Sequence, residues 1–427
     1  MMNPIRFGLA VAVTASLGFA SAHGEGDGKD EKSPLLDNLF QDGVKVTYKP
    51  GGGVTFASEK NDFSLNITGR IQAKWYYTQL DGGAGGTDSS VSSFQARRAR
   101  TKFSGHVFNE DVTYLVNLEH TNSPNVLDAL VGWRFINNES SFTSIVIGVQ
   151  KTRGALQSDI SASTLEFSER SIATRTFADQ RGTGAILQGG LMKNDNGHRL
   201  HWHVGIFNND TAGGDSTGAA TANTDSEFMY TAGLMFAGDG VERGATKLTE
   251  GDLDHNGRFQ PTVGVNLAAG TAPDYNGVTG SVQTLNIFGQ IKTGGGIAAQ
   301  AEYWMREDED RPTSTKADSS GWYAQASFTT KPGEGTQWGF AGRWAMIKAD
   351  DPNTALAPRP SLPGTGFGPG AIGPATGDMS EGTVGINAYY HKHKLKTQLN
   401  YVYQDISLDS GADFTNNGID IMFTLLF

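Results

Sequence analysis

The chain has 427 residues, a formal net charge of −11, 56 glycines and no cysteine. The lack of cysteine excludes disulfides, thiolate metal sites and thiol catalysis. Hydrophobic residues make up 37% of the chain and aromatic residues 10%. This balance excludes a disordered chain, and together with the high glycine content it indicates many strands joined by tight turns.

Residues 1–22 have the pattern of a secretory signal peptide. Arg6 supplies the positively charged start, Phe7–Ala20 the apolar stretch, and Ala20–Ala22 a small-residue cleavage site. We therefore expect cleavage after Ala22 and export from the cytoplasm. No later apolar run reaches the roughly 18 residues that a membrane helix requires.

The clearest pattern in the chain is the alternation in Phe63–Tyr77. A period of two over this length predicts a strand with one apolar and one polar face. The same pattern recurs down the chain, predicts about 16 strands and ends in alternation at the C-terminus. The apolar face of the first of these strands consists of Phe63, Leu65, Ile67, Ile71, Ala73, Trp75 and Tyr77.

These strands have the features of a membrane barrel. A soluble sandwich of this size would be more hydrophobic and have shorter strands, whereas here Trp or Tyr closes many apolar faces, as interfacial girdles do. We therefore predict an all-β fold, a transmembrane antiparallel β-barrel of about 16 strands in the bacterial outer membrane. Residues 23–60 are then a periplasmic N-terminal segment with short strands at Val44–Tyr48 and Gly53–Ala57, and residues 61–427 form the barrel.

The connections between strands alternate in length, as short periplasmic turns and long external loops do. The short ones are Asn122–Asn125, Asn194–Gly197 and His391–Lys394. The long polar ones, which we expect to be external, are Thr78–Ser93, Asn208–Glu227, Asp239–Phe259 and Ala349–Ser380.

The segment Thr152–Arg181 lacks clear periodicity, and about thirty such residues are too many for an ordinary connection. On the strand Gln95–Phe108, cations share the polar face, with Arg97 near its end. Two interpretations stay open: the cations pair with acids of the segment, or some stay free and set an ion preference. The candidate cations are Arg97, Arg98, Arg100, Lys102, Arg153, Arg170, Arg175 and Arg181, and the counter-charges are Asp159, Glu166, Glu169 and Asp179.

Several short motifs occur in a fixed order from about residue 42 to the C-terminus. Phe94–Arg100 (FQARRAR), Ile147–Thr152 (IGVQKT) and Glu166–Ser171 (EFSERS) are three of them. This ordered set resembles the signatures of the phosphate-selective porin (porin O/P) family. The resemblance implies a sixteen-stranded barrel, usually a homotrimer. It also implies that Thr152–Arg181 folds into the lumen as a constriction loop, with Arg97 and Arg98 beside it.

The sequence departs from the phosphate-specific members of that family at two positions. Gly270–Gly280 has no basic residue where those members have an arginine-rich segment, and Ser158 stands where they have a lysine. Two functions therefore remain. One is passive diffusion of small hydrophilic solutes, with anions such as phosphate favoured by the arginines. The other is a general or weakly cation-selective porin for uncharged or cationic solutes, with no phosphate site.

Other candidate sites are incomplete. Ser104 and His106 lie on one strand face without an acid to orient the histidine, so we expect no enzyme activity. Asp252, Asp254 and Asn256 resemble the start of a calcium loop, but Val263 stands where its glutamate is needed. His201 and His203 have no third metal ligand, and we expect them to be solvated. We expect no cofactor and no nucleic acid; small anions, outer-membrane lipid and further copies of the chain are the expected partners.

Overall fold

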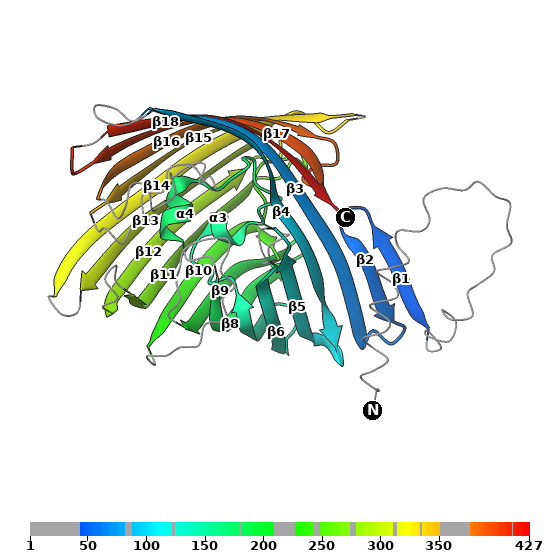
Figure 1. Cartoon of the computed structure of the whole chain (residues 1–427). Helices are drawn as coiled ribbons and strands as arrows, with labels where there is room; N and C mark the ends of the chain where they lie inside the picture. Colours follow the sequence, from blue (N-terminus) through cyan, green and yellow to red (C-terminus); the bar gives the residue numbers. More distant parts are fainter. Residues whose placement is uncertain are drawn as a thin grey trace.

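The computed structural model describes residues 43–81, 88–121, 124–178, 181–208, 227–242, 248–273, 279–310, 314–333, 335–350, 376–411 and 413–427. Within these ranges the chain forms eighteen strands and two short helices, α3 and α4 (Figure 1). None of the helices described is long and apolar enough to cross a membrane.

Strands β3 to β18 form the wall of the molecule, and each pairs antiparallel with the next along the chain. The first eight are β3 (Phe63–Asp81), β4 (Ser89–Val107), β5 (Asn109–Glu119), β6 (Asn125–Asn137), β7 (Phe142–Gln150), β8 (Gly182–Asn194), β9 (Gly197–Asn208) and β10 (Phe228–Val241). The others are β11 (Gln260–Pro273), β12 (Thr279–Lys292), β13 (Ile297–Asp310), β14 (Thr315–Thr329), β15 (Gln337–Ala349), β16 (Gly377–Tyr389), β17 (Leu395–Leu408) and β18 (Asp413–Leu426).

The last strand closes the sheet on the first strand of the wall. β18 pairs with β3 from Thr415 opposite Asp81 to Leu426 opposite Arg70. Closure satisfies the backbone polar groups of both strands, as a structure surrounded by lipid requires. The prediction of a closed antiparallel barrel of about 16 strands is confirmed.

A hairpin of β1 (Val44–Lys49) and β2 (Gly53–Ser58) continues the wall beyond this closure. β2 pairs with β3 from Val54 opposite Ile67 to Ala57 opposite Ser64, on the part of β3 that precedes its pairing with β18. The hairpin therefore lies beside the C-terminus (Figure 1). Both strands lie within one residue of the predicted ranges.

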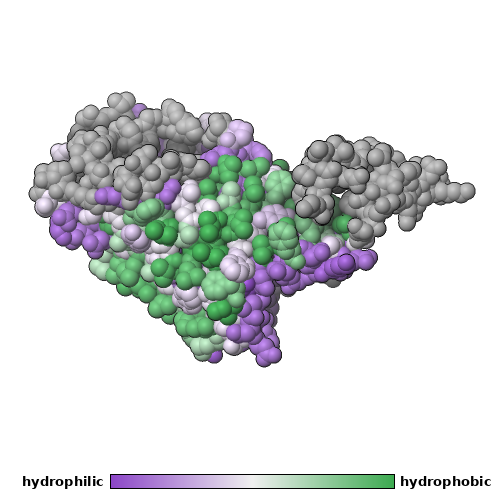
Figure 2. Space-filling model, turned by 90° about the horizontal axis from the view of Figure 1, so that it is seen from below, coloured by the Kyte–Doolittle hydropathy of each residue, from purple (hydrophilic) through white to green (hydrophobic). Residues whose placement is uncertain are grey.

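The alternation of side chains gives the wall two different faces. On β15, Trp338, Phe340 and Trp344 point outward and are about half exposed, whereas Arg343 and Ala345, on either side of Trp344, are buried inside. Figure 2 shows apolar residues over much of the outward surface. An apolar outside and a polar inside are what a barrel in lipid requires.

Strand register divides the connections between two ends of the barrel. The turns at Asn194–Gly197 and His391–Lys394 lie at the end that also holds the C-terminus, which we call the turn end. The strict alternation of lengths is wrong at two places. Asn122–Asn125 is short but lies at the opposite end, the loop end, because β5 ends there. Asp239–Phe259 is long but starts at the turn end, because Val241 pairs with His198.

Candidate functional site

The residues from Thr152 to Ala178, which we call the inward segment, lie inside the barrel with most of their side chains buried. They include α3 (Leu156–Asp159) and α4 (Ile172–Phe177), seen within the barrel in Figure 1. The N–H groups of Leu156 and Gln157 donate to the carboxylate of Glu302 on β13 at 2.9 and 2.7 Å. A wall carboxylate thus satisfies two donors that a helix start leaves without a partner.

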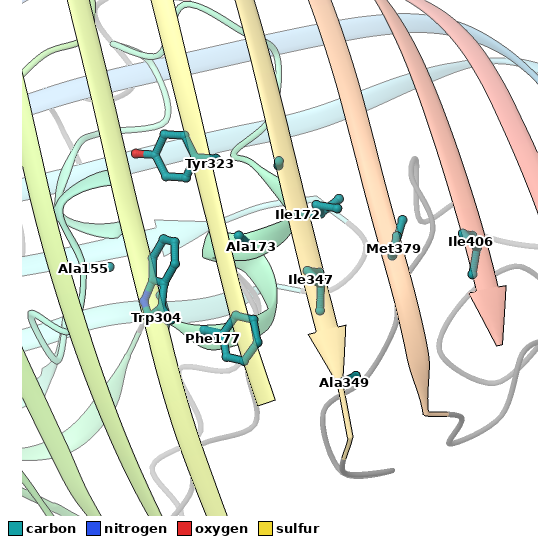
Figure 3. Close-up of a cluster of buried hydrophobic side chains, with 12 residues drawn as sticks. Ala155, Ile172, Ala173, Phe177, Trp304, Tyr323, Ile347, Ala349, Met379 and Ile406 are labelled. Atoms are coloured by element: carbon teal, nitrogen blue, oxygen red, sulfur yellow. The ribbon is translucent and has the colours of Figure 1, made fainter. Parts of the chain in front are cut away.

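An apolar cluster fastens α4 to the wall, although the lumen of such a barrel is otherwise polar. Figure 3 shows Ile172, Ala173 and Phe177 among side chains from β13 to β17. The ring of Phe177 stacks on Trp304, with 6.3 Å between ring centroids. Because these groups are buried away from water, α4 has a fixed position against one side of the barrel.

Further round the wall, beyond β18, Glu169 of the inward segment meets three cations of β3 and β4. Its Oε1 lies 2.6 Å from Arg97 Nε and 3.7 Å from Lys74 Nζ, and its Oε2 lies 3.0 Å from Arg98 Nη2. Lys74 Nζ is also 3.4 Å from Asp420 on β18. The structure thus brings together Arg97, Arg98 and Glu169 from the predicted set, and it adds Lys74.

A β-bulge in β4 explains how two consecutive arginines reach one carboxylate. Gln72 lies opposite Arg98 but Ala73 lies opposite Ala96, so Arg97 is the extra residue. A bulge changes the direction of its side chain, which in a regular strand would point away from that of Arg98. The side chain of Arg98 is 1% exposed and that of Arg97 is 28% exposed.

Most other predicted cations also have partners. Arg100 pairs with Glu119 at 2.6 Å, Arg181 with Asp128 at 2.9 Å and Arg153 with Asp159 at 3.7 Å. Arg170 donates to backbone oxygens of its own segment, including Gln157 O and Ile160 O, each at 2.9 Å. The inward segment therefore uses part of its charge to hold its own shape.

Three predicted residues have other positions. Lys102 lies on the lumen face of β4, partly exposed, and makes no hydrogen bond or ion pair with any residue that the structure describes. Arg175 is partly exposed on α4, and Glu166 is buried beside Glu250. Asp179 lies outside the described residues.

Sequence reasoning missed four charged residues that hold the inward segment. Arg343 on β15 donates to Glu169 O at 3.1 Å, and Lys396 on β17 donates to Leu165 O. Glu302 on β13 and Glu250 hold α3 from two directions. Glu302, Arg343 and Lys396 lie on polar strand faces, which is the signal that marks them as lumenal.

The other candidate sites do not assemble. Asp252 accepts from Gly296 N, Asp254 pairs with Lys392, and Asn256 accepts from Arg258 N. Within the part of the chain that the structure describes, no three His, Cys, Asp or Glu side chains are placed to hold a metal ion.

The expectation that His201 and His203 are solvated is wrong, since both are buried. Nε2 of His201 lies 2.9 Å from both His198 O and Val241 O. Among the described residues, His106 contacts Ser64 Oγ and Asn61 O, and none of its partners there is an acid.

A closed sixteen-stranded barrel, an apolar belt and a polar lumen narrowed by an inward segment define an outer-membrane channel. The sequence profile of the family "Phosphate-selective porin O and P" matches residues 65–427, and the chain belongs to this family. Family and fold indicate a channel and not an enzyme, located in the bacterial outer membrane.

Solved porin structures have the same fold. The anion-selective porin from Comamonas acidovorans is 10% identical, with a TM-score of 0.51 over 86% of this chain and 100% of that chain. Pseudomonas putida OprB is 9% identical, with a TM-score of 0.50 over 84% and 94% of the two chains. The channel DcaP of Acinetobacter baumannii is 11% identical, with a TM-score of 0.49 over 88% and 100%. No curated protein sequence matches the chain.

Proposed function

We propose that the protein lets small hydrophilic solutes diffuse passively across the outer membrane and favours anions, such as phosphate. The observation that carries this proposal is the excess of cations at the inward segment. Lys74, Arg97 and Arg98 share Glu169, and the one further carboxylate among these pairs is that of Asp420. In this cluster of described residues, three cations thus face two carboxylates.

Further cations on β3 and β4 extend this charge toward the turn end. Arg70 lies opposite Arg100, and Lys102 follows two residues further along β4 on the same face. Arg70 and Lys102 are partly exposed inside the barrel. Fixed charges that line a narrow, low-dielectric channel concentrate ions of the opposite sign. An anion that passes the inward segment therefore meets more positive charge on the same wall.

The alternative is a general or weakly cation-selective porin without a phosphate site. The net charge of −11 and the acidic end of β13 favour it. There, however, Glu307 and Glu309 share the outward face of Met305 and contact Lys316, while Asp308 pairs with Arg306. These described carboxylates therefore contribute little to the field along the lumen.

Current through single channels in a planar bilayer tests the proposal. Under a KCl gradient we expect the reversal potential to lie on the chloride side, and we expect added phosphate to reduce the current. A reversal potential on the potassium side, with no effect of phosphate, would establish the cation-selective alternative. A protein that folds and forms no channel would refute both.

We also propose that the mature chain starts at His23, that residues 23–60 lie in the periplasm and that the protein is a homotrimer. The position of the β1–β2 hairpin at the turn end supports the second point, since short turns face the periplasm in outer-membrane barrels. The intact mass of the exported protein and native mass spectrometry in detergent test the first and third points.

A further inference from the structure

A second stretch enters the barrel, from the turn end. Leu248–Asp254, which we call the anchor segment, belongs to the connection between β10 and β11. Leu248, Glu250, Asp252 and Leu253 are at most 5% exposed. This is the connection that the sequence predicts as an external loop, and that prediction is wrong.

Hydrogen bonds from three wall strands and from the turn before β13 hold the anchor segment. Gln290 on β12 donates to Thr249 O at 3.1 Å, and Thr329 on β14 donates to Asp252 O at 2.6 Å. In the turn before β13, Gly296 N donates to Asp252 Oδ2 at 2.9 Å. At the start of β15, Gln337 donates to Leu253 O at 3.2 Å. The anchor segment therefore has a fixed position against the inner face of the wall.

Glu250 joins the anchor segment to the inward segment. Its Oε1 accepts from Gln157 Nε2 at 2.7 Å and its Oε2 accepts from Glu166 N at 2.8 Å. Its own N–H donates to Thr164 O at 3.1 Å. Leu248 and Leu156 belong to one apolar cluster, which also includes Met235 and Phe288 of the wall. One side chain thus holds two points of the inward segment that are nine residues apart.

The backbone conformation at Gly251 allows this contact. Its φ is +70°, in the left-handed region that favours glycine. A Cβ at this position would lie 2.8 Å from Glu166 Oε1. The turn that presents Glu250 therefore depends on glycine for its conformation and for its close approach to Glu166.

We propose that Glu250 is a positioning residue that sets the aperture of the channel by holding the inward segment from the periplasmic side. The proposal rests on the channel function proposed above. The apolar cluster around Phe177 fixes α4, and Glu169 is held by cations, but residues 157–166, from within α3 to three residues before Glu169, depend on other contacts. Without the carboxylate of Glu250, the buried N–H of Glu166 loses its partner. Among the described residues, the side-chain N–H donor of Gln157 then keeps only a contact of 3.4 Å with Gln325 Oε1. This stretch is then held less firmly, by the remaining bonds, which include those with Glu302, Arg170 and Lys396.

The protonation of Glu166 agrees with this contact. Burial, followed by the nearby charge of Glu250, raises the pKa of Glu166 to about 8. Near neutral pH Glu166 is therefore mostly uncharged, so its carboxyl group can lie beside that of Glu250.

Single-channel recording of the full chain with Glu250→Ala tests the proposal. We expect frequent transitions among conductance levels, with the time spent outside the main level raised at least about tenfold, because the loss of even one of the two hydrogen bonds to this charged group has about that effect. Liposome swelling with sugars of increasing size should show a larger size limit. Asp254→Ala is the matched control, because it removes a carboxylate of the same segment that is exposed and contacts only Lys392 among the described residues. This control should behave like wild type.

A folded Glu250→Ala barrel with the steady current and size limit of wild type would refute the role of Glu250 and leave the channel function intact. If Glu250→Ala does not fold, Glu250→Gln keeps the volume and one acceptor oxygen. It should then show the same transitions at a lower frequency, and a steady current from it would refute the proposal. A wild-type protein without conductance would instead refute the channel function itself.

Discussion

Replacing Glu169 by glutamine removes the carboxylate that Lys74, Arg97 and Arg98 share. Glutamine has nearly the same volume and keeps one acceptor oxygen. Arg98 also donates to Gln72 at 3.2 Å, and Arg343 donates to the backbone oxygen of residue 169, which does not change. We therefore expect the Glu169→Gln barrel to fold with its inward segment in place and with one more net positive charge in the lumen.

The size of the effect follows from Coulomb's law. A unit charge about 5 Å from a permeating ion contributes about 0.8 kcal/mol at the dielectric constant of water. That energy corresponds to about a fourfold rise in the permeability to chloride and about a fourfold fall in that to potassium, so the ratio of the two changes about 16-fold. Because Arg97 is 28% exposed and lies at the edge of the cluster, its charge is within reach of a solute. A lower dielectric constant in the narrow lumen would make the change larger.

The assay is the reversal potential under a KCl gradient, recorded from wild type and Glu169→Gln in the same lipid. Glu307→Gln is the control, because it also removes one carboxylate but on the outward face of β13, where Lys316 lies 2.7 Å away. We expect a higher chloride preference for Glu169→Gln and an unchanged chloride preference for the control. An unchanged or lower chloride preference for a folded Glu169→Gln barrel would refute the idea that the shared cations set selectivity.

Three further predictions follow from the lumen contacts. Lys102→Glu changes the charge by two units beside the permeation path, so the permeability to chloride should fall about 15-fold by the same estimate; an unchanged reversal potential contradicts this. Glu166 is faced by Glu250, Lys292 and Lys396, and its pKa of about 8 exceeds the ordinary 4.5. Glu166 therefore binds its proton more tightly when the inward segment is attached than when it is free. Attachment of the inward segment should weaken as the pH rises from about 4.5 to 8. Current noise should rise over that range in wild type and not in Glu166→Gln; noise that falls with pH contradicts this. Phe177→Ala should destabilise the packing of the apolar cluster by about 3–5 kcal/mol and expose the inward segment to protease. Phe94 is 84% exposed on the outside, so Phe94→Ala should do neither; equal resistance of the two variants to protease contradicts this.

The strands could be predicted because lipid and water act on opposite faces of each one. Alternation over Thr336–Ile347 predicts β15 within two residues of its observed bounds. The prediction for β4 begins at Gln95, but the strand starts at Ser89. Residues 89–93 are small and mostly polar on both faces, so they carry no alternation, and pairing with β3 extends the strand.

The charge cluster at the inward segment could be predicted in some of its residues but not in its geometry. The sequence places Arg98, Arg100 and Lys102 on one face by their spacing, and the register confirms that shared face. It leaves the direction of Arg97 undecided, because a bulge depends on the register with the neighbouring strand. Lys74 lies on the polar face of β3, which marks it as lumenal. Its contact with Glu169 could not be predicted, because the two residues are far apart in the chain.

The anchor segment could not be predicted because polarity does not distinguish a lumenal segment from an external one. In a channel both are in contact with polar groups or water, so the acidic residues of Asp239–Phe259 suit either place. The length of Thr152–Arg181 and its resemblance to a known motif indicated that segment. Nothing comparable marked Glu250, whose bond to Gln157 spans 93 residues of the chain.

The two interpretations of the arginines, paired or free, turn out not to exclude each other. One carboxylate that contacts three cations fixes their positions, and it cancels only one of their charges. Fixed charges stabilise a passing ion without the cost of reorganising first, and a planar guanidinium loses little freedom when its partner is in place. Under the proposed function, pairing through Glu169 therefore orders the cations, and the three cations that face Glu169 and Asp420 supply the positive field that favours anions.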